Sequence, residues 1–412
     1  MTSFKETFYN TRITNIPEGL FDKCTNVTDF GGAFQECINL TSIPEGLFDK
    51  CTEVTDFSYT FRDCNGLTEI PSGLFDYNTK VTTFGYTFYK CKKLQSIPKR
   101  LFDSNIEVTD FSDAFGFCSS LQSIPIGLFD KCTKVTDFSS AFYGTGITSI
   151  PTGLFDKCTK VTDFGGAFGG TNISNIPEGL FDACTEVTNF NQTFYFCESL
   201  QAIPEGLFDA CTKVTSFGQT FANSTNLTTI PEGLFDKCTE VTNFHQTFWR
   251  CHNLQEIPSN TFGTEAAGVD FTEIFHYCNA LTIIKSNAFN CPNLTSLAGL
   301  FKNITSLTTV EKDAFNCPSV TSFKETFYNT RITNIPEGLF DKCTKVTDFS
   351  GTFYGCTGLE GESPYTMVNG VKVHLYERSS YPEYFTAPTI FTNCFDSCTG
   401  LTDYSIIPTT WK

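Results

Sequence analysis

A phrase of 26 or 27 residues repeats along almost the whole chain and constrains the fold more than any other feature. Its consensus is L-T-x-I-P-x-G-L-F-D-x-C-T-x-V-T-x-F-x-x-x-F-x-x-C. A fixed period of this length is typical of solenoids, in which each repeat forms one coil that packs on the next. The sequence therefore predicts a solenoid of about thirteen coils over residues 1–359. The Ile-Pro junctions or their degenerate equivalents begin at Ile16, Ile43, Ile70, Ile97, Ile124, Ile150, Ile176, Ile203, Ile230, Ile257, Ile284, Val310 and Ile335.

Each phrase divides into two similar halves, and each half has a strand-like tetrad followed by a tight turn. We call the turn after Ile-Pro the first turn (44–51 in one coil) and the other the second turn (57–64). Proline ends the first-half tetrad of each regular phrase because it has no N–H to donate. We expect short parallel strands, tight helical turns and two half-repeats per coil. Three phenylalanine columns form the expected core, with members such as Phe21, Phe48, Phe57 and Phe61.

The chain has 20 cysteines, and most of them recur at the same place in the two turns. Where the first-turn column skips a cysteine, Asn78 and Asn105 take its place. Asparagine cannot replace a disulfide partner or a metal thiolate, but both side chains donate hydrogen bonds to backbone oxygens. The sequence therefore predicts a structural ladder, with first-turn members Cys24, Cys51, Cys132, Cys158, Cys184, Cys211 and Cys238.

The combination of Phe, Cys and Ile-Pro positions resembles the bacterial surface leucine-rich repeats of the BspA type. The closest correspondence is the branch that reads VTDFSGTFYGCTGLTSIP, which is nearly reproduced at 346–358 and 133–151. The resemblance implies a right-handed, leucine-rich-repeat-like parallel β solenoid. It also implies adhesion or protein binding at the cell surface or after secretion, and no catalytic residues. The chain itself shows no signal peptide at its start.

The pattern breaks after Leu359, and residues 360–412 are expected to form a C-terminal cap. The segment YTMVNGVKVHLY (365–376) has two alternating runs around Asn369-Gly370, which predicts a β-hairpin. The following half-coil regains the repeat spacing. An alternative interpretation makes this piece a docking tip with Tyr376, Tyr381 and Tyr384.

Charge and motif content argue against several classes of function. The net charge of −17 disfavours nucleic acid and anionic membrane surfaces as partners. No apolar run approaches the roughly 20 residues of a membrane span. We expect no enzyme, cofactor or metal site, because no nucleophile has a base and the histidines His245, His252 and His276 lack zinc-site spacing. A calcium ladder along the Asp22 and Asp49 column is the alternative for the acidic residues, although it lacks the β-roll signature.

The position just after the last phenylalanine of the second turn, such as Tyr89 after Phe88, varies while its neighbours repeat. Free variation indicates exposure, and Tyr, Trp and Arg are the residues that anchor interfaces. The alternative is neutral drift at a solvated turn. The predicted binding residues are Tyr89, Tyr143, Tyr195, Trp249 and His276, with Gln192, Gln219 and Gln246 beside them.

Residues 2–25 are identical to residues 321–344, so the chain opens in the middle of a repeat. Two alternatives stay open: an upstream segment of the chain covers this coil, or another chain makes an end-to-end assembly contact there. The main functional hypothesis is a repeat protein that binds a protein or glycan partner through one solenoid face. The competing hypothesis is a structural or virion-fibre component in which the solenoid is a spacer and residues 360–412 dock.

Overall fold

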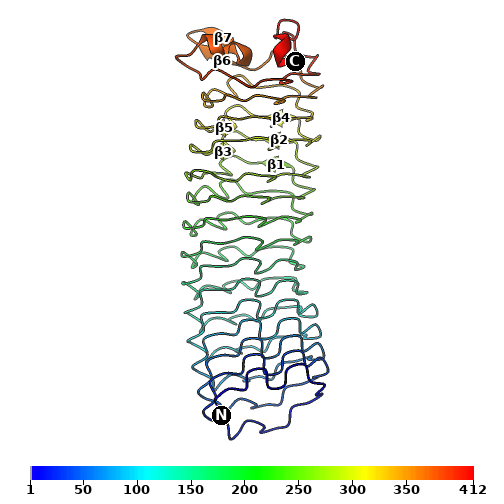
Figure 1. The fold of residues 1–412 in the computed structure, drawn as a ribbon, viewed down its shortest axis with the longest axis vertical. Helices are drawn as coiled ribbons and strands as arrows, with labels where there is room; N and C mark the ends of the chain where they lie inside the picture. Colours follow the sequence, from blue (N-terminus) through cyan, green and yellow to red (C-terminus); the bar gives the residue numbers. More distant parts are fainter. Residues whose placement is uncertain (1) are drawn as a thin grey trace. The chain divides into compact units, whose positions relative to one another are not determined.

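The computed structural model describes residues 2–412 and divides the chain into two compact units. Unit 1 comprises Met1–Leu200 and Ala210–Thr212, and unit 2 comprises Gln201–Asp209 and Lys213–Lys412. Within each unit the repeats form coils stacked one on the next (Figure 1). The expected boundary after residue 359 lies inside unit 2. Residues 2–412 contain no helix of the length and apolarity that crossing a membrane requires.

Neighbouring coils of unit 1 meet through one parallel β-bridge per coil rather than through longer strands. This series of bridges joins Asp29, Asp56, Thr83, Asp110, Asp137, Asp163 and Asn189. Two-residue parallel strands form only in unit 2. One sheet has the order β1 (Glu256–Ile257), β2 (Ile283–Ile284) and β4 (Thr309–Val310), and a second pairs β3 (Phe289–Asn290) with β5 (Phe315–Asn316).

The absence of proline explains where the first of these sheets forms. Lys285 and Glu311 stand where regular coils have proline, and their N–H groups donate to Ile257 O and Ile284 O, at 2.9 Å each. A proline at either place would remove that donor. Among residues 2–412, the strand-like tetrads predicted for every coil therefore become paired strands only within residues 256–310, which we call the variant segment.

The turns are not helical, so that part of the prediction is wrong. The described residues contain no α-helix and two short 3-10 helices, η1 (Leu375–Ser380) and η2 (Thr409–Trp411). In a typical second turn, Thr60 N donates to Phe57 O and Cys64 N donates to Phe61 O. Tyr59 and Asp63, the third residues of these two turns, have φ near +60°. Positive φ at that position gives type II turns, which cannot continue into a helix.

Three phenylalanine columns fill the core of each unit. Their rings are almost fully buried, including Phe21, Phe48, Phe57 and Phe61. Within a column the ring centroids lie farther apart than the expected coil spacing of ~4.8 Å, as in Phe48–Phe75 at 6.3 Å. Rings of different columns approach more closely, as in Phe48–Phe57 at 4.8 Å. Rings therefore stack with an offset inside a column and tilt between columns, as aromatic quadrupoles favour.

Side chains join the first turns of successive coils. Asn78 Nδ2 donates to Phe48 O at 3.1 Å and to Cys51 O at 2.9 Å. Cys51 Sγ makes a longer contact of 3.8 Å with Phe21 O in the coil before. Cys24 is half-buried, whereas the other predicted members are buried: Cys51, Cys132, Cys158, Cys184, Cys211 and Cys238. Burial raises the pKa of the Cys51 thiol to about 12.

The C-terminal piece contains an antiparallel pair, β6 (Tyr365–Val368) and β7 (Val371–His374). Asn369 and Gly370 form the connection, and both have positive φ. After β7, the fully buried Arg378 donates to Phe340 O at 3.2 Å and to Cys343 O at 3.1 Å. These are the carbonyls of a first-turn Phe and Cys, the same pair that Asn78 reaches in the coil before its own. Arg378 thus occupies the place of the next ladder member.

Candidate binding surface

The second turns of successive coils are joined by backbone atoms as well as by buried side chains, such as Thr60 Oγ1, which donates to Phe30 O at 3.0 Å, and Cys64 Sγ, which donates to Phe34 O at 3.2 Å. Four alternate N–H groups of one turn donate to four carbonyls of the next turn, at 2.7–3.3 Å. Because the main chain and these buried side chains make the contacts, the exposed side chains of the second turns are not needed for stacking. The four pairs in one turn are Phe57 to Thr83, Tyr59 to Gly85, Phe61 to Thr87 and Asp63 to Tyr89.

Aromatic side chains form a continuous row on the second turns of unit 1. The Tyr59 and Tyr86 rings are stacked at 4.7 Å, and Tyr86 meets Tyr89 edge-on at 5.3 Å. Tyr89 then contacts Phe117 at 5.5 Å, and Phe117 contacts Tyr143 at 5.3 Å. Five rings from four coils therefore make one surface feature, which we call the aromatic row.

Glycines in the next coil leave the space in which these rings lie. A Cβ added to Gly169 would be 2.6 Å from Tyr143 Cε2, and one added to Gly116 would be 3.0 Å from Tyr89 Cδ2. Both glycines are buried. Tyr89, Gly116, Tyr143 and Gly169 hold the same position in four successive coils. This alternation of tyrosine and glycine is visible in the sequence, and our sequence reasoning missed it.

The residues predicted for binding in unit 1 all lie on the second turns. Tyr89 and Tyr143 belong to the aromatic row and are partly exposed. Burial raises the pKa of both phenols. Tyr195 is partly exposed and contacts Phe196, whose ring is 46% exposed, while Gln192 is exposed.

In unit 2 the predicted residues form two groups on the second turns. Gln219 donates to Gln246 Oε1, and Gln246 donates to Glu273 Oε2, each at 2.6 Å. The Arg250 guanidinium lies 4.2 Å from the Trp249 ring centre. The His276 ring stacks on Tyr277 at 4.0 Å.

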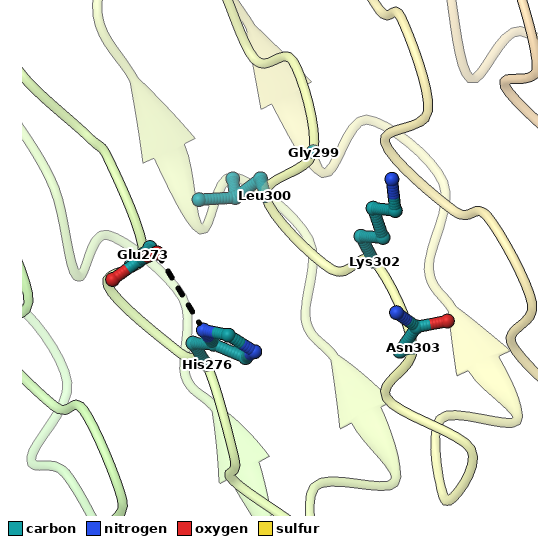
Figure 2. A pocket seen from close by; sticks show the side chains of 6 residues that line it. All are labelled: Glu273, His276, Gly299, Leu300, Lys302 and Asn303. Carbon is teal, nitrogen blue, oxygen red and sulfur yellow. Dashed lines mark ion pairs between the residues drawn. The ribbon is translucent and has the colours of Figure 1, made fainter.

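A shallow cavity of about 210 Å³ lies on the second turns beside His276 (Figure 2). The His276 Nδ1 atom is 3.8 Å from Glu273 Oε1, and Gly299 and Lys302 lie on the next coil. In Figure 2 the polar groups line the hollow from two neighbouring turns. The cavity therefore offers an imidazole, a carboxylate and an ammonium group to a polar ligand.

A second cavity, of about 540 Å³, opens beside Gly351 in unit 2. The stacked rings of Tyr328 and Tyr354, 4.6 Å apart, line it together with Lys324 and Asn393. Gly351 and Gly299 occupy the same position in their second turns, and a cavity lies at each. Variation on the second turns thus produces aromatic ridges where rings occur and hollows where glycine occurs.

Carboxylates lie on, or directly before, the second turns that carry the aromatic row in unit 1, and Asp113 accepts a hydrogen bond from Tyr86 of that row. Asp137 Oδ1 accepts from Ser139 N at 2.7 Å, and Asp110 Oδ1 accepts from Ser112 N at 2.8 Å. Burial raises the pKa of Asp137, and the neighbouring Asp163 and Asp110 add to this shift. Burial also raises the pKa of Asp113 to about 6, against the lowering effect of a hydrogen bond from Tyr86.

The C-terminal piece contains a serine, histidine and aspartate cluster that sequence reasoning missed. Ser363 Oγ donates to Asp403 Oδ2 at 2.5 Å and lies 2.9 Å from His374 Nδ1. A nucleophilic serine needs the imidazole between hydroxyl and carboxylate. Here both partners contact the serine, which is fully buried. The cluster therefore joins β7 to the chain end and does not offer a nucleophile to a substrate.

The remaining predicted groups lie apart from this surface or do not converge. Of the tyrosines considered for a docking tip, Tyr376 stacks on His374 and Tyr381 packs on a small core of Val368, Val373 and Phe385. Tyr384 is 42% exposed. Within residues 2–412, no three His, Cys, Asp or Glu side chains are grouped so that they could hold a metal ion.

Comparison with family models gives the repeat its identity. The model described as "BspA type Leucine rich repeat region" matches in six copies at residues 1–109, 85–218 and 169–267. The chain belongs to the BspA-type leucine-rich repeat family. A second model, described as "Mycoplasma protein of unknown function, DUF285", matches residues 269–372. The match of this chain to the BspA-type model thus ends, and the match to the second model begins, inside the variant segment.

Solved structures similar to this chain are also repeat proteins. A leucine-rich cell surface protein from Faecalibacterium prausnitzii is 19% identical, with a TM-score of 0.33 over 73% of this chain and 83% of that one. A leucine-rich repeat protein from Bacteroides ovatus is 17% identical, with a TM-score of 0.26 over 92% and 87%.

A chain in the structure of the Toll–Spätzle complex of Drosophila is longer and is 15% identical, with a TM-score of 0.35 over 86% of this chain. The chain spans about half the length, 49%, of that structure. No match to a curated protein sequence is found.

Proposed function

We propose that this BspA-type chain is a non-enzymatic binding protein that recognises a protein partner through the second-turn face of its solenoid. The observation that carries the proposal is that the second turns stack without using their exposed side chains. Backbone bonds and buried Thr and Cys side chains stack the second turns, while their exposed side chains form rings, hollows and charged groups that stacking does not require. Rings, arginines and adaptable amides are typical of protein interfaces.

Adhesion at a cell surface or after secretion is the setting that the family implies for this chain. A glycan partner is the second form of the same proposal. In both cases the C-terminal hairpin serves as a cap, in which Arg378 ends the first-turn ladder and the partner binds elsewhere.

The test is capture of partner proteins by two immobilised forms of the full chain. One form is the natural chain, and the other carries Tyr143→Ser, Tyr195→Ser and Trp249→Ser. We expect the variant to lose the proteins that the natural chain retains from an extracellular extract. Its far-ultraviolet circular dichroism should stay the same, because backbone bonds and buried side chains still stack these turns.

A matched variant keeps the test specific. Lys50→Ser, Lys131→Ser and Lys157→Ser change three exposed residues of the first turns and should leave capture unchanged. Retention of the same proteins by the second-turn variant would reject the proposal.

A further inference from the structure

The second turns of residues 110–118, 137–144 and 163–170 combine aromatic rings with a single sign of charge. They contain four carboxylates and no Lys or Arg. We call this surface the acidic-aromatic face. Its members are Asp110, Asp113, Phe117, Asp137, Tyr143 and Asp163, all of unit 1.

None of the four carboxylates takes part in an ion pair that the described residues supply. Arg62 lies close enough to Asp113 to lower its pKa in part, whereas burial and the neighbouring Asp163 and Asp110 raise the pKa of Asp137. Asp110, Asp137 and Asp163 are successive members of one parallel bridge series. Their charges therefore repel one another, and a cationic partner would relieve that repulsion.

The rings of this face are held in position by glycines of the next coil. Phe117 is 38% exposed. A Cβ on Gly144 would lie 2.9 Å from Phe117 Cδ1, and one on Gly169 would lie 2.6 Å from Tyr143 Cε2. Each ring thus rests on a glycine of the next coil. Pre-positioned rings lose little conformational entropy when a partner binds.

The chain itself shows which chemistry such rings attract. Arg62 lies 5.3 Å from the Tyr89 ring centre, and Lys90 lies 5.1 Å from it. In unit 2, Arg250 lies 4.2 Å from the Trp249 ring centre, and Lys302 lies 4.8 Å from that of Tyr328. No such contact with a chain cation is found for Phe117 or Tyr143 in the described residues. This end of the aromatic row has the carboxylates but lacks the cation.

We propose that the acidic-aromatic face docks an extended segment of a partner protein rich in Lys and Arg. Its ammonium and guanidinium groups would lie over Phe117 and Tyr143 and pair with Asp110, Asp137 and Asp163. Alternate side chains of an extended segment are about 6.7 Å apart. That spacing is on the scale of the 5.5 and 5.3 Å between successive rings. The inference rests on the proposed function and names the partner's chemistry.

The experiment measures binding of a fluorescent, end-blocked decapeptide of alternating Lys and Ser to the full chain. The face variant carries Asp110→Asn, Asp137→Asn and Asp163→Asn. Asparagine already occupies the equivalent position at Asn189, where its Oδ1 accepts from Asn191 N at 2.9 Å, so the turn keeps its acceptor. The matched control carries Asp130→Asn, Asp156→Asn and Asp182→Asn on exposed first-turn sites.

We expect the face variant to bind the Lys-Ser peptide about tenfold more weakly and the control to bind it within about twofold. A peptide of alternating Gln and Ser should not bind the natural chain. Equal weakening in both variants, no weakening in the face variant, or no binding to the natural chain would each overturn the inference.

A second variant tests the rings without removing them. Gly169→Ala would displace the Tyr143 ring, and we expect about fivefold weaker binding of the Lys-Ser peptide. Gly358→Ala is the control, because its added Cβ would meet only ordinary contacts of 3.7 Å or more. Unchanged affinity in the Gly169 variant would contradict the role of the rings.

The same variants separate this inference from the proposed function. If chitohexaose binds the natural chain and the face variant equally but not Tyr143→Ser, the occupant is a glycan and the inference fails. If the Tyr143, Tyr195 and Trp249 variant loses protein capture while the face variant binds the Lys-Ser peptide normally, the proposed function stands and the inference fails.

Discussion

The first and second turns of each coil are similar in sequence, and both have side chains that donate to the previous coil, but in regular coils the second turns also have backbone bonds between coils. In the first turn, side chains reach the previous coil, as Asn78 does to Phe48 O and Cys51 O. In the second turn, main-chain N–H groups reach the next coil, as Tyr59 N does to Gly85 O. A turn must keep the buried side chains that stack it, whereas the added backbone bonds leave the exposed positions of the second turns free to vary. This difference explains why recognition is expected on the second turns.

The largest expected effect comes from removing the arginine that ends the first-turn ladder. Arg378→Ala would remove the side-chain donor to Cys343 O, leave Phe340 O with the Cys343 N–H alone, and open a cavity. We expect a loss of about 3–5 kcal/mol in the free energy of unfolding of the C-terminal piece. Hydrogen exchange over residues 338–412 measures it. Lys372→Ala, which removes an exposed ion pair with Glu362, is the control. An equally small effect of both changes would contradict the ladder-end role.

A smaller effect is expected inside the ladder. Asn105 Nδ2 donates to Phe75 O at 3.2 Å and to Asn78 O at 3.0 Å, so Asn105→Ala removes both bonds. We expect a cost of about 2–3 kcal/mol in urea unfolding. Asn105→Cys restores the residue found in other coils and should cost under about 1 kcal/mol. If cysteine proved as costly as alanine, the two residues would not be equivalent in the ladder.

The variant segment provides a test of proline's role. Lys285→Pro would delete the bond from Lys285 N to Ile257 O, while Lys285→Ala would keep it. Regular coils accept proline at this position, so the ring itself should fit. We expect the proline variant to be about 1–2 kcal/mol less stable than the alanine variant in urea unfolding. Equal stability would mean that the backbone bond does not matter there.

The smallest expected change is a gain in stability on the second turn. Burial raises the pKa of Asp113 to about 6 in the folded chain, whereas its ordinary value is 3.8. The folded state therefore holds a proton that the unfolded state loses, and stability falls as pH rises from about 4 to about 6. Asp113→Asn removes this loss. We expect it to be about 1 kcal/mol more stable than the natural chain at pH 7, and equal to it at pH 4. A constant difference across this range would contradict the assignment.

Much of the scaffold was predictable, because packing repeats the same residues in every coil. The period indicated the solenoid, and the exchange of Cys for Asn78 and Asn105 indicated a hydrogen-bonding column. The helical turns were wrong because positive φ at residues such as Tyr59 and Asp63 leaves no mark in the sequence when glycine is absent there.

Contacts made by residues outside the repeats could not be predicted from the period. Arg378 reaches the ladder from an insertion, and Ser363 meets Asp403 from 40 residues away. Their spacing follows no repeat. The contact of Tyr143 with Gly169 could have been predicted, because tyrosine and glycine alternate at this position from coil to coil. Finding it required comparing neighbouring coils rather than reading one column at a time.

The most direct test compares urea unfolding of two triple variants, followed by circular dichroism. The second-turn variant is Phe117→Ala, Tyr143→Ala and Tyr195→Ala, and the first-turn variant is Cys132→Ala, Cys158→Ala and Cys184→Ala, which removes the thiol donors. If the exposed second-turn side chains are not needed for stacking and the buried first-turn cysteines are, the former should cost under about 2 kcal/mol and the latter about 5 kcal/mol. A second-turn cost equal to or above the first-turn cost would contradict this account.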